Sequence, residues 1–167
     1  MRYGLEGVED RSWIEQVDLK SGVETTESES LSEAERLLLV DVAKFNVWRM
    51  ERSASVLDLR DVDLSNQDLR GAMLFKIRFD RGKFENVNLE GANVMGSSFV
   101  LADLAGANLL RAHAELADFT GSNLTGASFQ ETYLTLSNLS GANVQGVRWD
   151  GSDMTLAIGA DSIRGLS

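Results

Sequence analysis

The chain contains no cysteine and only one histidine among its 167 residues. Without cysteine, neither a disulfide framework nor a thiolate metal site or nucleophile is available, and the redox state of the compartment is not constrained. The single histidine, His113, has no convergent pair of carboxylates in the sequence, which makes it a weak candidate for a metal ligand or a catalytic base. The composition therefore predicts a protein that is not an enzyme and holds no metal or cofactor.

Long apolar runs and clustered basic residues are also missing. No stretch of about eighteen apolar residues occurs, and the N-terminal sequence MRYGLEGVEDRSW is acidic and lacks the apolar centre of a signal peptide. We therefore expect a cytoplasmic protein. The 16 Lys and Arg residues face 26 Asp and Glu residues, a formal net charge of −10, which argues against direct binding to nucleic acid or to an anionic membrane.

The dominant feature that is present is an apolar residue at every fifth position from Leu59 to Met154. This period fits neither the helical period of about 3.6 residues nor the strand period of two, so five residues form one structural step. We call the apolar residue the centre of each pentad. The centres are Leu59, Leu64, Leu69, Leu74, Phe79, Phe84, Leu89, Val94, Phe99, Leu104, Leu109, Ala114, Phe119, Leu124, Phe129, Leu134, Leu139, Val144, Trp149 and Met154.

Each pentad reads as a short extended side followed by a corner. The residue two before the centre is mostly Ala or Ser, which predicts two inward positions in every five. The residue two after the centre is repeatedly Gly, the type required where a turn needs positive φ. Asp or Asn often precedes the centre. These short side chains predict hydrogen bonds to nearby backbone at the turns, with a calcium-binding ladder as the weaker alternative.

The sequences Ala102-Asp103-Leu104-Ala105-Gly106 and Gly106-Ala107-Asn108-Leu109 resemble the A(D/N)LxG pattern of the pentapeptide-repeat family. In that family four pentads make one square coil, so the resemblance implies an all-β solenoid, a right-handed quadrilateral β-helix of about five twenty-residue coils. At a spacing of about 4.8 Å per coil, the stack would be about 24 Å tall.

The rest of the chain divides around this repeat. Residues 1–30 are expected to form an irregular acidic N-terminal segment, and residues 31–55 an α-helical cap over the first coil. Ser32 and Glu35 make a capping-box signature before a helix predicted from Glu33 to about Glu51, with a buried stripe of Leu38, Val42, Phe45 and Trp48. The β-helix is assigned to residues 56–155 and a short C-terminal cap to residues 156–167.

Folding the outward positions onto a twenty-residue coil brings several large apolar and aromatic residues onto one side. Exposed residues of this type predict a protein interface, since soluble monomers seldom present large apolar patches. The alternatives are cover by residues 1–30 and singly exposed residues of no special role, and His113 is more simply a surface or interface residue than a chemical group. This predicted apolar face comprises Met73, Phe75, Met95, His113, Leu116, Tyr133 and Leu136.

Some members of the resembled family imitate duplex DNA toward a DNA-binding machine, so the resemblance implies an acidic DNA-mimic surface. The charge is uneven along the rod, because six basic residues offset the acids before Phe84 and only Arg111 and Arg148 follow it. Residues 58–155 carry a net charge of −5, against about fourteen phosphates on about 24 Å of duplex. The predicted acidic surface comprises Glu85, Glu90, Asp103, Glu115, Asp118, Glu131, Asp150 and Asp153.

Two functions follow as expectations. The first is an inhibitor or competitor that mimics duplex DNA toward a DNA-binding protein or complex, such as a topoisomerase or a CRISPR-type effector. The second is an interaction scaffold or homodimer that uses the apolar face. Both predict a protein partner, with no direct contact to nucleic acid or membrane.

Overall fold

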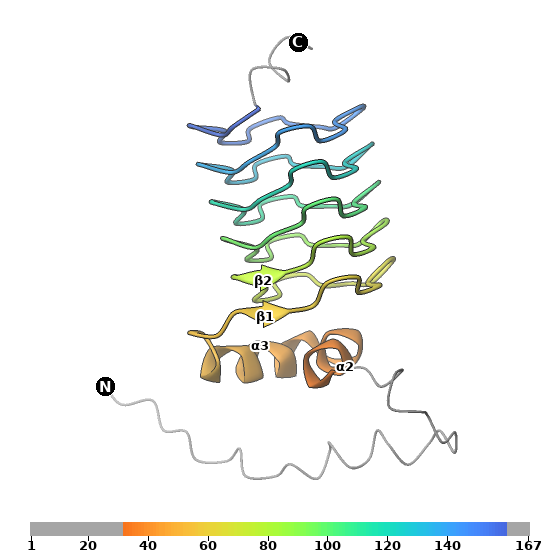
Figure 1. The fold of residues 1–167 in the computed structure, drawn as a ribbon, viewed down its shortest axis with the longest axis vertical. Helices are drawn as coiled ribbons and strands as arrows, with labels where there is room; N and C mark the ends of the chain where they lie inside the picture. Colours follow the sequence, from red (N-terminus) through yellow and green to blue (C-terminus); the bar gives the residue numbers. More distant parts are fainter. Residues whose placement is uncertain (1–31, 160–167) are drawn as a thin grey trace. The chain divides into compact units, whose positions relative to one another are not determined.

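The structure is a computed structural model that describes residues 32–159. Two helices, α2 (Glu33–Val40) and α3 (Val42–Glu51), precede the strands β1 (Leu57–Asp58) and β2 (Ile77–Arg78). Residues 57–156 then form five twenty-residue coils of a right-handed quadrilateral β-helix, stacked above the helices (Figure 1). The predicted N-terminal segment 1–30 and most of the predicted cap 156–167 lie outside the described residues.

The coils are held together by parallel pairing between residues twenty apart. β1 pairs with β2 in the register Leu57↔Ile77, and isolated bridges repeat the same step up the rod, as in His113↔Tyr133. The N–H of each centre from Leu59 to Leu139 donates to a carbonyl nineteen residues later, for example from Leu74 to Asn93 at 2.7 Å. The bridge Asn138↔Ile158 carries this pairing past Thr155, the predicted end of the β-helix.

The corners explain the glycine pattern. Every residue two after a centre has positive φ, including Gly71 at 64° and Asn66 at 61°. At most corners the centre's carbonyl accepts an N–H three residues later, as from Ala72 to Leu69 at 3.1 Å, which is the hydrogen bond of a β-turn. Glycine adopts this left-handed conformation without a steric penalty, whereas in other residues the close contact of Cβ with the backbone raises the conformational energy.

Each coil has four sides, which we name by their centres and call faces A, B, C and D in chain order. The centres alternate around the rod, so that faces A and C are opposite, as are B and D. Face A has the centres Leu59, Phe79, Phe99, Phe119 and Leu139; face B has Leu64, Phe84, Leu104, Leu124 and Val144; face C has Leu69, Leu89, Leu109, Phe129 and Trp149; face D has Leu74, Val94, Ala114, Leu134 and Met154.

The centres form a continuous core along the axis of the rod. On face A the rings of Phe79, Phe99 and Phe119 stack at centroid distances of 5.2 and 5.3 Å. The ring of Phe84 meets Phe79 and Phe99 edge-on from face B. The second inward position takes mostly Ala, Ser or Thr, and the hydroxyl of Thr132 donates to the Leu109 carbonyl. The core therefore needs no separate globular domain, because each coil buries its apolar side on the next.

The helical cap is present, but the prediction of one helix from Glu33 to Glu51 was wrong. The helix ends at Val40, and Asp41, with φ −160° and ψ 98°, separates α2 from α3. The Asp41 side chain then accepts the N–H of Lys44 and caps the second helix. The extended backbone at Asp41 is the usual conformation of an N-cap residue.

The start of the cap follows the sequence prediction more closely. Ser32 and Glu35 form the predicted capping box, with each side chain bonded to the other's backbone N–H. Leu38 and Phe45 are buried as predicted, while Val42 and Trp48 are half-buried. The buried stripe also includes Arg49, which the sequence did not indicate.

Candidate protein-binding surface

The described residues offer little chemistry for a reaction. Within residues 32–159, no group of three or more His, Cys, Asp or Glu side chains is placed to hold a metal ion. Nδ1 of His113 lies 3.4 Å from Oε1 of Glu115, a carboxylate whose other oxygen is buried, and its ring stacks on Tyr133 at 4.9 Å. In the same part of the chain, no helix combines the length and the apolar character needed to cross a membrane.

The Asp and Asn residues before the centres bond to the backbone, as predicted. The Asn93 side chain accepts the N–H of Met95 at 3.0 Å, and the Asp103 side chain accepts the N–H of Ala105 at 3.0 Å. Neighbouring coils add side-chain bonds, such as that from Asn123 to Asp103 at 2.9 Å. These side chains therefore stabilise the turns and the stack.

The structure divides the predicted apolar face into a covered part and an exposed part. Met73 and Phe75 are half-buried in the first coil, against α3. The Arg49 guanidinium lies 4.4 Å from the centroid of the Phe75 ring and donates to the Phe75 carbonyl, while Asn46 accepts the N–H of Met73. The cap of this chain thus occupies the N-terminal end of the predicted face.

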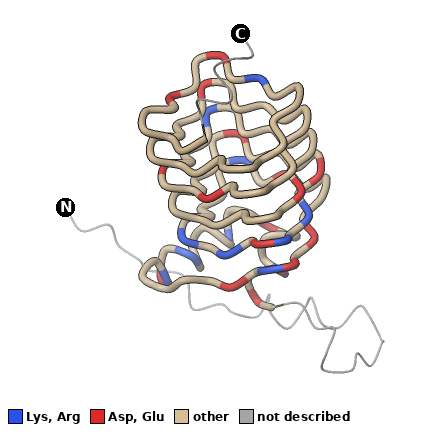
Figure 2. The backbone as a smooth tube through the Cα atoms, turned by 45° about the horizontal axis from the view of Figure 1, so that its top comes forward, with Lys and Arg blue, Asp and Glu red and all other residues tan. Residues whose placement is uncertain are grey.

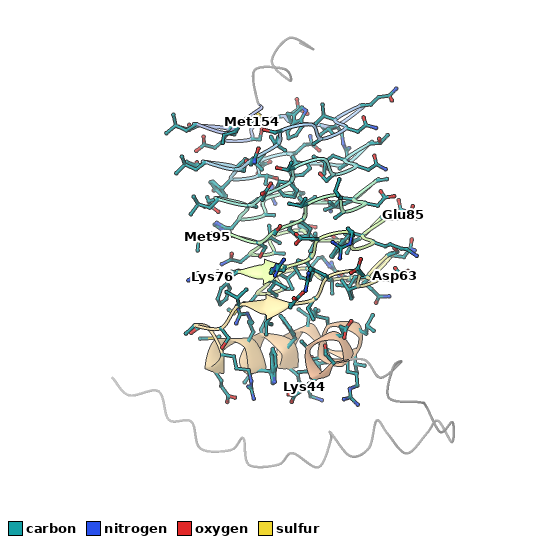
Figure 3. All side chains as sticks on the ribbon, in the orientation of Figure 1. Lys44, Asp63, Lys76, Glu85, Met95 and Met154 are labelled. Carbon is teal, nitrogen blue, oxygen red and sulfur yellow. The ribbon has the colours of Figure 1, made fainter. Side chains whose placement is uncertain are left out.

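The exposed part runs along face D and the corner that follows it. Met95, Tyr133, Leu116 and Leu136 are exposed by 38, 46, 58 and 50 %, and the ring of His113 stacks beneath that of Tyr133. Figure 3 shows Met95 on the same side of the rod as Lys76, opposite Asp63 and Glu85. These five residues of the prediction are therefore accessible on one side of the molecule.

Sequence reasoning missed two exposed residues that continue this surface. Leu156 is exposed by 72 % and Ile158 by 59 %. Leu156 is twenty residues beyond Leu136, and the signal was therefore present in the period itself. Both residues were assigned to the C-terminal cap, although Leu156 ends the fifth coil and Ile158 pairs with Asn138 just beyond it.

The charges divide the rod into two parts. All five acidic residues between Leu57 and Lys83 lie within ion-pair distance of an arginine or lysine. Figure 2 shows the basic residues gathered at this end of the rod, near the cap. The pairs are Arg60–Asp58 at 2.6 Å, Arg70–Asp68 at 2.6 Å, Arg81–Asp61 at 2.8 Å, Lys83–Asp63 at 3.7 Å and Arg78–Asp80 at 3.6 Å.

These contacts lower the pKa of the carboxyl groups. Side-chain hydrogen bonds from Arg60, Arg81 and Arg70 lower the pKa of Asp58, Asp61 and Asp68, respectively, below the ordinary value of 3.8. The same acids raise the pKa of their arginines. The acids between Leu57 and Phe84 are thus locally neutralised.

Beyond Phe84 the predicted acidic surface is mostly without cationic partners. Of its eight members, Glu131 pairs with Arg111 at 2.7 Å, which lowers the pKa of Glu131, and Glu115 contacts only His113. The other six form no ion pair with any residue of the described part of the chain: Glu85, Glu90, Asp103, Asp118, Asp150 and Asp153.

The structure does not gather these six acids on one side. Asp118 lies on face A, Glu85 and Asp103 on face B, and Asp153 on face D, with Glu90 and Asp150 on face C. Asp103, Asp118 and Asp153 also bond to neighbouring side chains or backbone. The acidic surface therefore encircles the C-terminal part of the rod.

The coils, the pentad period and the corner geometry define a solenoid repeat protein. The family model described as Pentapeptide repeats matches residues 58–94, 83–121 and 97–135, with eight copies of the repeat. Residues 58–135 are therefore pentapeptide repeats, and their coils form the kind of extended surface that solenoid proteins use for binding.

Solved structures of similar proteins include members of the same family. QnrB1, a plasmid-mediated fluoroquinolone resistance protein, is 21 % identical over 59 % of this chain and 51 % of its own, with a TM-score of 0.46. A pentapeptide repeat protein from the Arabidopsis thaliana thylakoid lumen is 34 % identical over 59 % and 65 %, with a TM-score of 0.31. One from Nostoc is 23 % identical over 65 % and 94 %, with a TM-score of 0.40.

This chain spans about half the length of the QnrB1 structure that it matches. No curated protein sequence matches it significantly.

Proposed function

We propose that this protein is a non-enzymatic inhibitor or competitor that imitates duplex DNA toward a DNA-binding protein or complex, such as a topoisomerase or a CRISPR-type effector. The observation that carries the proposal is the distribution of ion pairs. Within the described part of the chain, every acid between Leu57 and Phe84 pairs with a basic neighbour, and six of the eight acids between Phe84 and Thr155 do not. A partner that approaches the C-terminal part of the rod therefore meets uncompensated negative charge.

The charge density of this part supports the comparison with DNA. Residues 84–155 contain eight acidic and two basic side chains, a net charge of −6. They occupy about 17 Å of the rod at 4.8 Å per coil, a length of duplex that carries about ten phosphates. The charge per unit length of the C-terminal part is thus closer to that of a DNA duplex than the charge per unit length of the whole rod is.

The placement of the acids on all four faces also fits this proposal. Phosphates surround a duplex rather than forming a single stripe, and a protein that encloses DNA contacts several sides of it. A flat partner, in contrast, would meet only the one or two acids of one face. The proposed target is therefore a protein with a basic channel or groove.

The experiment immobilises the protein, loads bacterial extract, and elutes first with short duplex DNA and then with high salt. Duplex DNA should release DNA-binding proteins, because it competes for the same basic groove, and a loading buffer of high salt should prevent their capture. The purified protein should also inhibit supercoiling by a bacterial type II topoisomerase, or target binding by a CRISPR effector, if that is the target.

The decisive variant removes charge where it is not paired: Glu85→Gln, Glu90→Gln and Asp150→Asn together. The matched control removes three charges from the neutralised coils: Asp58→Asn, Asp61→Asn and Asp68→Asn. The first variant should lose binding at least tenfold more than the control. Equal binding by both variants, or proteins that duplex DNA does not displace, would contradict DNA mimicry.

An interaction scaffold on the apolar face is the second candidate. The specific observation in its favour is the exposure of Met95, Tyr133, Leu116 and Leu136 on one side of the rod. Binding through this surface should survive high salt and should not depend on the three acids replaced above. The salt and duplex elutions therefore separate the two functions in one experiment.

A further inference from the structure

Three leucines are stacked on the corner between face D and face A. Leu116, Leu136 and Leu156 each lie two residues after a face D centre, one coil apart. The N–H of Leu116 donates to Thr135, and that of Leu136 donates to Thr155, both at 3.0 Å, which fixes the three at equivalent positions. The bridges His113↔Tyr133 and Asn138↔Ile158 flank this stack on its two sides. We call Leu116, Leu136, Leu156 and Ile158 the leucine corner.

Leucine is an unfavourable residue at these positions on two counts. The backbone is left-handed, with φ of 60°, 61° and 58°, a conformation in which Cβ of an L-residue is crowded. Glycine occupies the equivalent Gly96 one coil earlier, where it avoids this strain. The three leucines are also at least half exposed to solvent, and they therefore add little to the core. Neither the backbone nor the fold's own packing explains them.

Leu101 is a useful contrast because it has the same backbone conformation and exposure. Its φ is 58° and it is 63 % exposed, but it lies on the corner after face A. Its side chain extends over Gly121 in the next coil, where Cδ2 would lie 2.9 Å from a Cβ at that glycine. Leu101 thus has an intramolecular neighbour and no leucine above or below it.

The charges around the leucine corner point to its occupant. On the fourth and fifth coils its flanking residues are uncharged: Thr135, Asn138, Thr155 and Ile158. The chain as a whole carries −10, so two copies repel each other over most of their surfaces. An uncharged apolar ridge is the place where a second copy can approach at the lowest electrostatic cost.

The third coil determines the orientation of such a pair. There the corner is flanked by two acids, Glu115 and Asp118. A parallel pair would place Glu115 of one copy opposite Asp118 of the other, because the two-fold axis runs along the rods. An antiparallel pair instead places Glu115 and Asp118 of each copy opposite the uncharged Thr155 and Ile158 of the other, and the acids that directly flank the corner stay apart.

We propose that the leucine corner is a homodimer interface in which two rods pair antiparallel about a two-fold axis at Leu136. Leu136 then contacts Leu136 of the other copy, and Leu116 contacts Leu156 of the other copy. The three leucine positions are therefore self-complementary. The contact spans only about 10 Å of each rod at 4.8 Å per coil, and it therefore forms a small interface and a reversible dimer with a micromolar dissociation constant. This inference does not rest on DNA mimicry.

The first experiment is sedimentation equilibrium of the full chain between about 1 and 300 μM, with Leu136→Asp as the test variant. The wild type should shift from 18.3 kDa toward twice that mass, and Leu136→Asp should raise the dissociation constant at least a hundredfold. Leu101→Asp, the matched control, should dimerise like the wild type. A wild type that stays monomeric at 300 μM, or a dimer that Leu136→Asp does not weaken, overturns the proposal.

The orientation is tested by cross-linking, because the chain has no cysteine of its own. Under mild oxidation Leu136→Cys should form a disulfide with itself. Leu116→Cys and Leu156→Cys should each form no intermolecular disulfide alone, and they should form one when they are mixed. Self-linking of Leu116→Cys and of Leu156→Cys would mean a parallel pair and would overturn the antiparallel arrangement, as would the absence of any disulfide.

Discussion

The side chain of Arg49 is completely buried and joins the helical cap to the β-helix through Phe75. Its guanidinium lies 4.4 Å from the centroid of the Phe75 ring, and Nη2 donates to the Phe75 carbonyl at 2.7 Å. The same nitrogen donates to the Ser55 carbonyl, and Nη1 donates to Arg52. Burial lowers the pKa of Arg49. One side chain thus satisfies three backbone carbonyls at the junction.

Arg49→Ala is therefore expected to lower the free energy of unfolding by about 3 kcal/mol, because it leaves buried carbonyls without a donor and opens a cavity. Urea denaturation followed by circular dichroism measures this change. Glu51→Ala, at an exposed position of the same helix, should change stability by less than about 0.5 kcal/mol. Equal effects of the two substitutions would show that Arg49 does not hold the cap.

Gly82 is required for space and not for its backbone conformation. A Cβ at Gly82 would lie 2.7 Å from Cε2 of Phe84 and 2.9 Å from the Phe79 carbonyl oxygen. Gly82→Ala is expected to destabilise the protein by about 1–3 kcal/mol through overpacking. Gly126, at a corner with φ 69°, has no atom near an added Cβ, and Gly126→Asn should cost less than about 1 kcal/mol. Thermal unfolding of both variants checks the ranking, and the reverse order would refute it.

Ala114 is the only centre smaller than valine, and it is fully buried in the third coil. We expect the stacked rings of Phe79, Phe99 and Phe119 on the adjoining face A to fill the volume that a larger centre would occupy. Ala114→Leu should then overpack the core and lower the free energy of unfolding by about 1–3 kcal/mol. Denaturant unfolding measures the effect. A gain in stability would reveal a void beside Ala114.

The ion pairs of the first coils predict a loss of stability in acid. The lowered pKa values of Asp58, Asp61 and Asp68 mean that folding favours their charged forms. Their contribution is fully present above the ordinary pKa of 3.8 and is lost as the pH falls through the lowered values. The midpoint of urea denaturation should therefore be steady from about pH 7 to 5 and fall below about pH 4.

Arg81→Gln isolates one of these pairs, because Arg81 bonds to Asp61 across adjacent coils at 2.8 Å. The variant should be slightly less stable than the wild type near neutral pH, and the difference should shrink as Asp61 becomes protonated. Unfolding midpoints of both proteins across the acid range measure that difference. A constant difference down to about pH 2 would assign it to packing of the arginine side chain instead.

Much of the β-helix could be predicted from single residues. Each pentad has an apolar centre, a small inward residue and often a corner glycine. This pattern is satisfied by a square coil of four pentads, and the observed bridges join residues twenty apart, as such a coil requires. The break at Asp41 was not predicted, because helix-forming residues flank it on both sides, although Asp is a favoured N-cap residue and an N-cap has extended backbone.

The candidate surfaces were less predictable than the fold. Sequence alone located Tyr133, Leu116 and Leu136 on one side of a coil, because the period determines the side. It could not show that Arg49 would cover Phe75, since a contact between residues 26 apart depends on how the cap sits on the rod. It also could not show which acids would be neutralised, because Asp61 and Arg81 meet only through the stacking of coils.

The sequence by itself determined the period, the number of coils, the identity of the inward residues and the net charge, all of which are local or additive properties. The tertiary structure decided which outward side chains are left exposed and unpaired. That outcome depends on contacts between coils and with the cap, where Leu136 and Leu156 come to lie one above the other and Phe75 is covered. The function of a solenoid depends on these exposed outward side chains, because its interior is filled by the side chains of its own repeats.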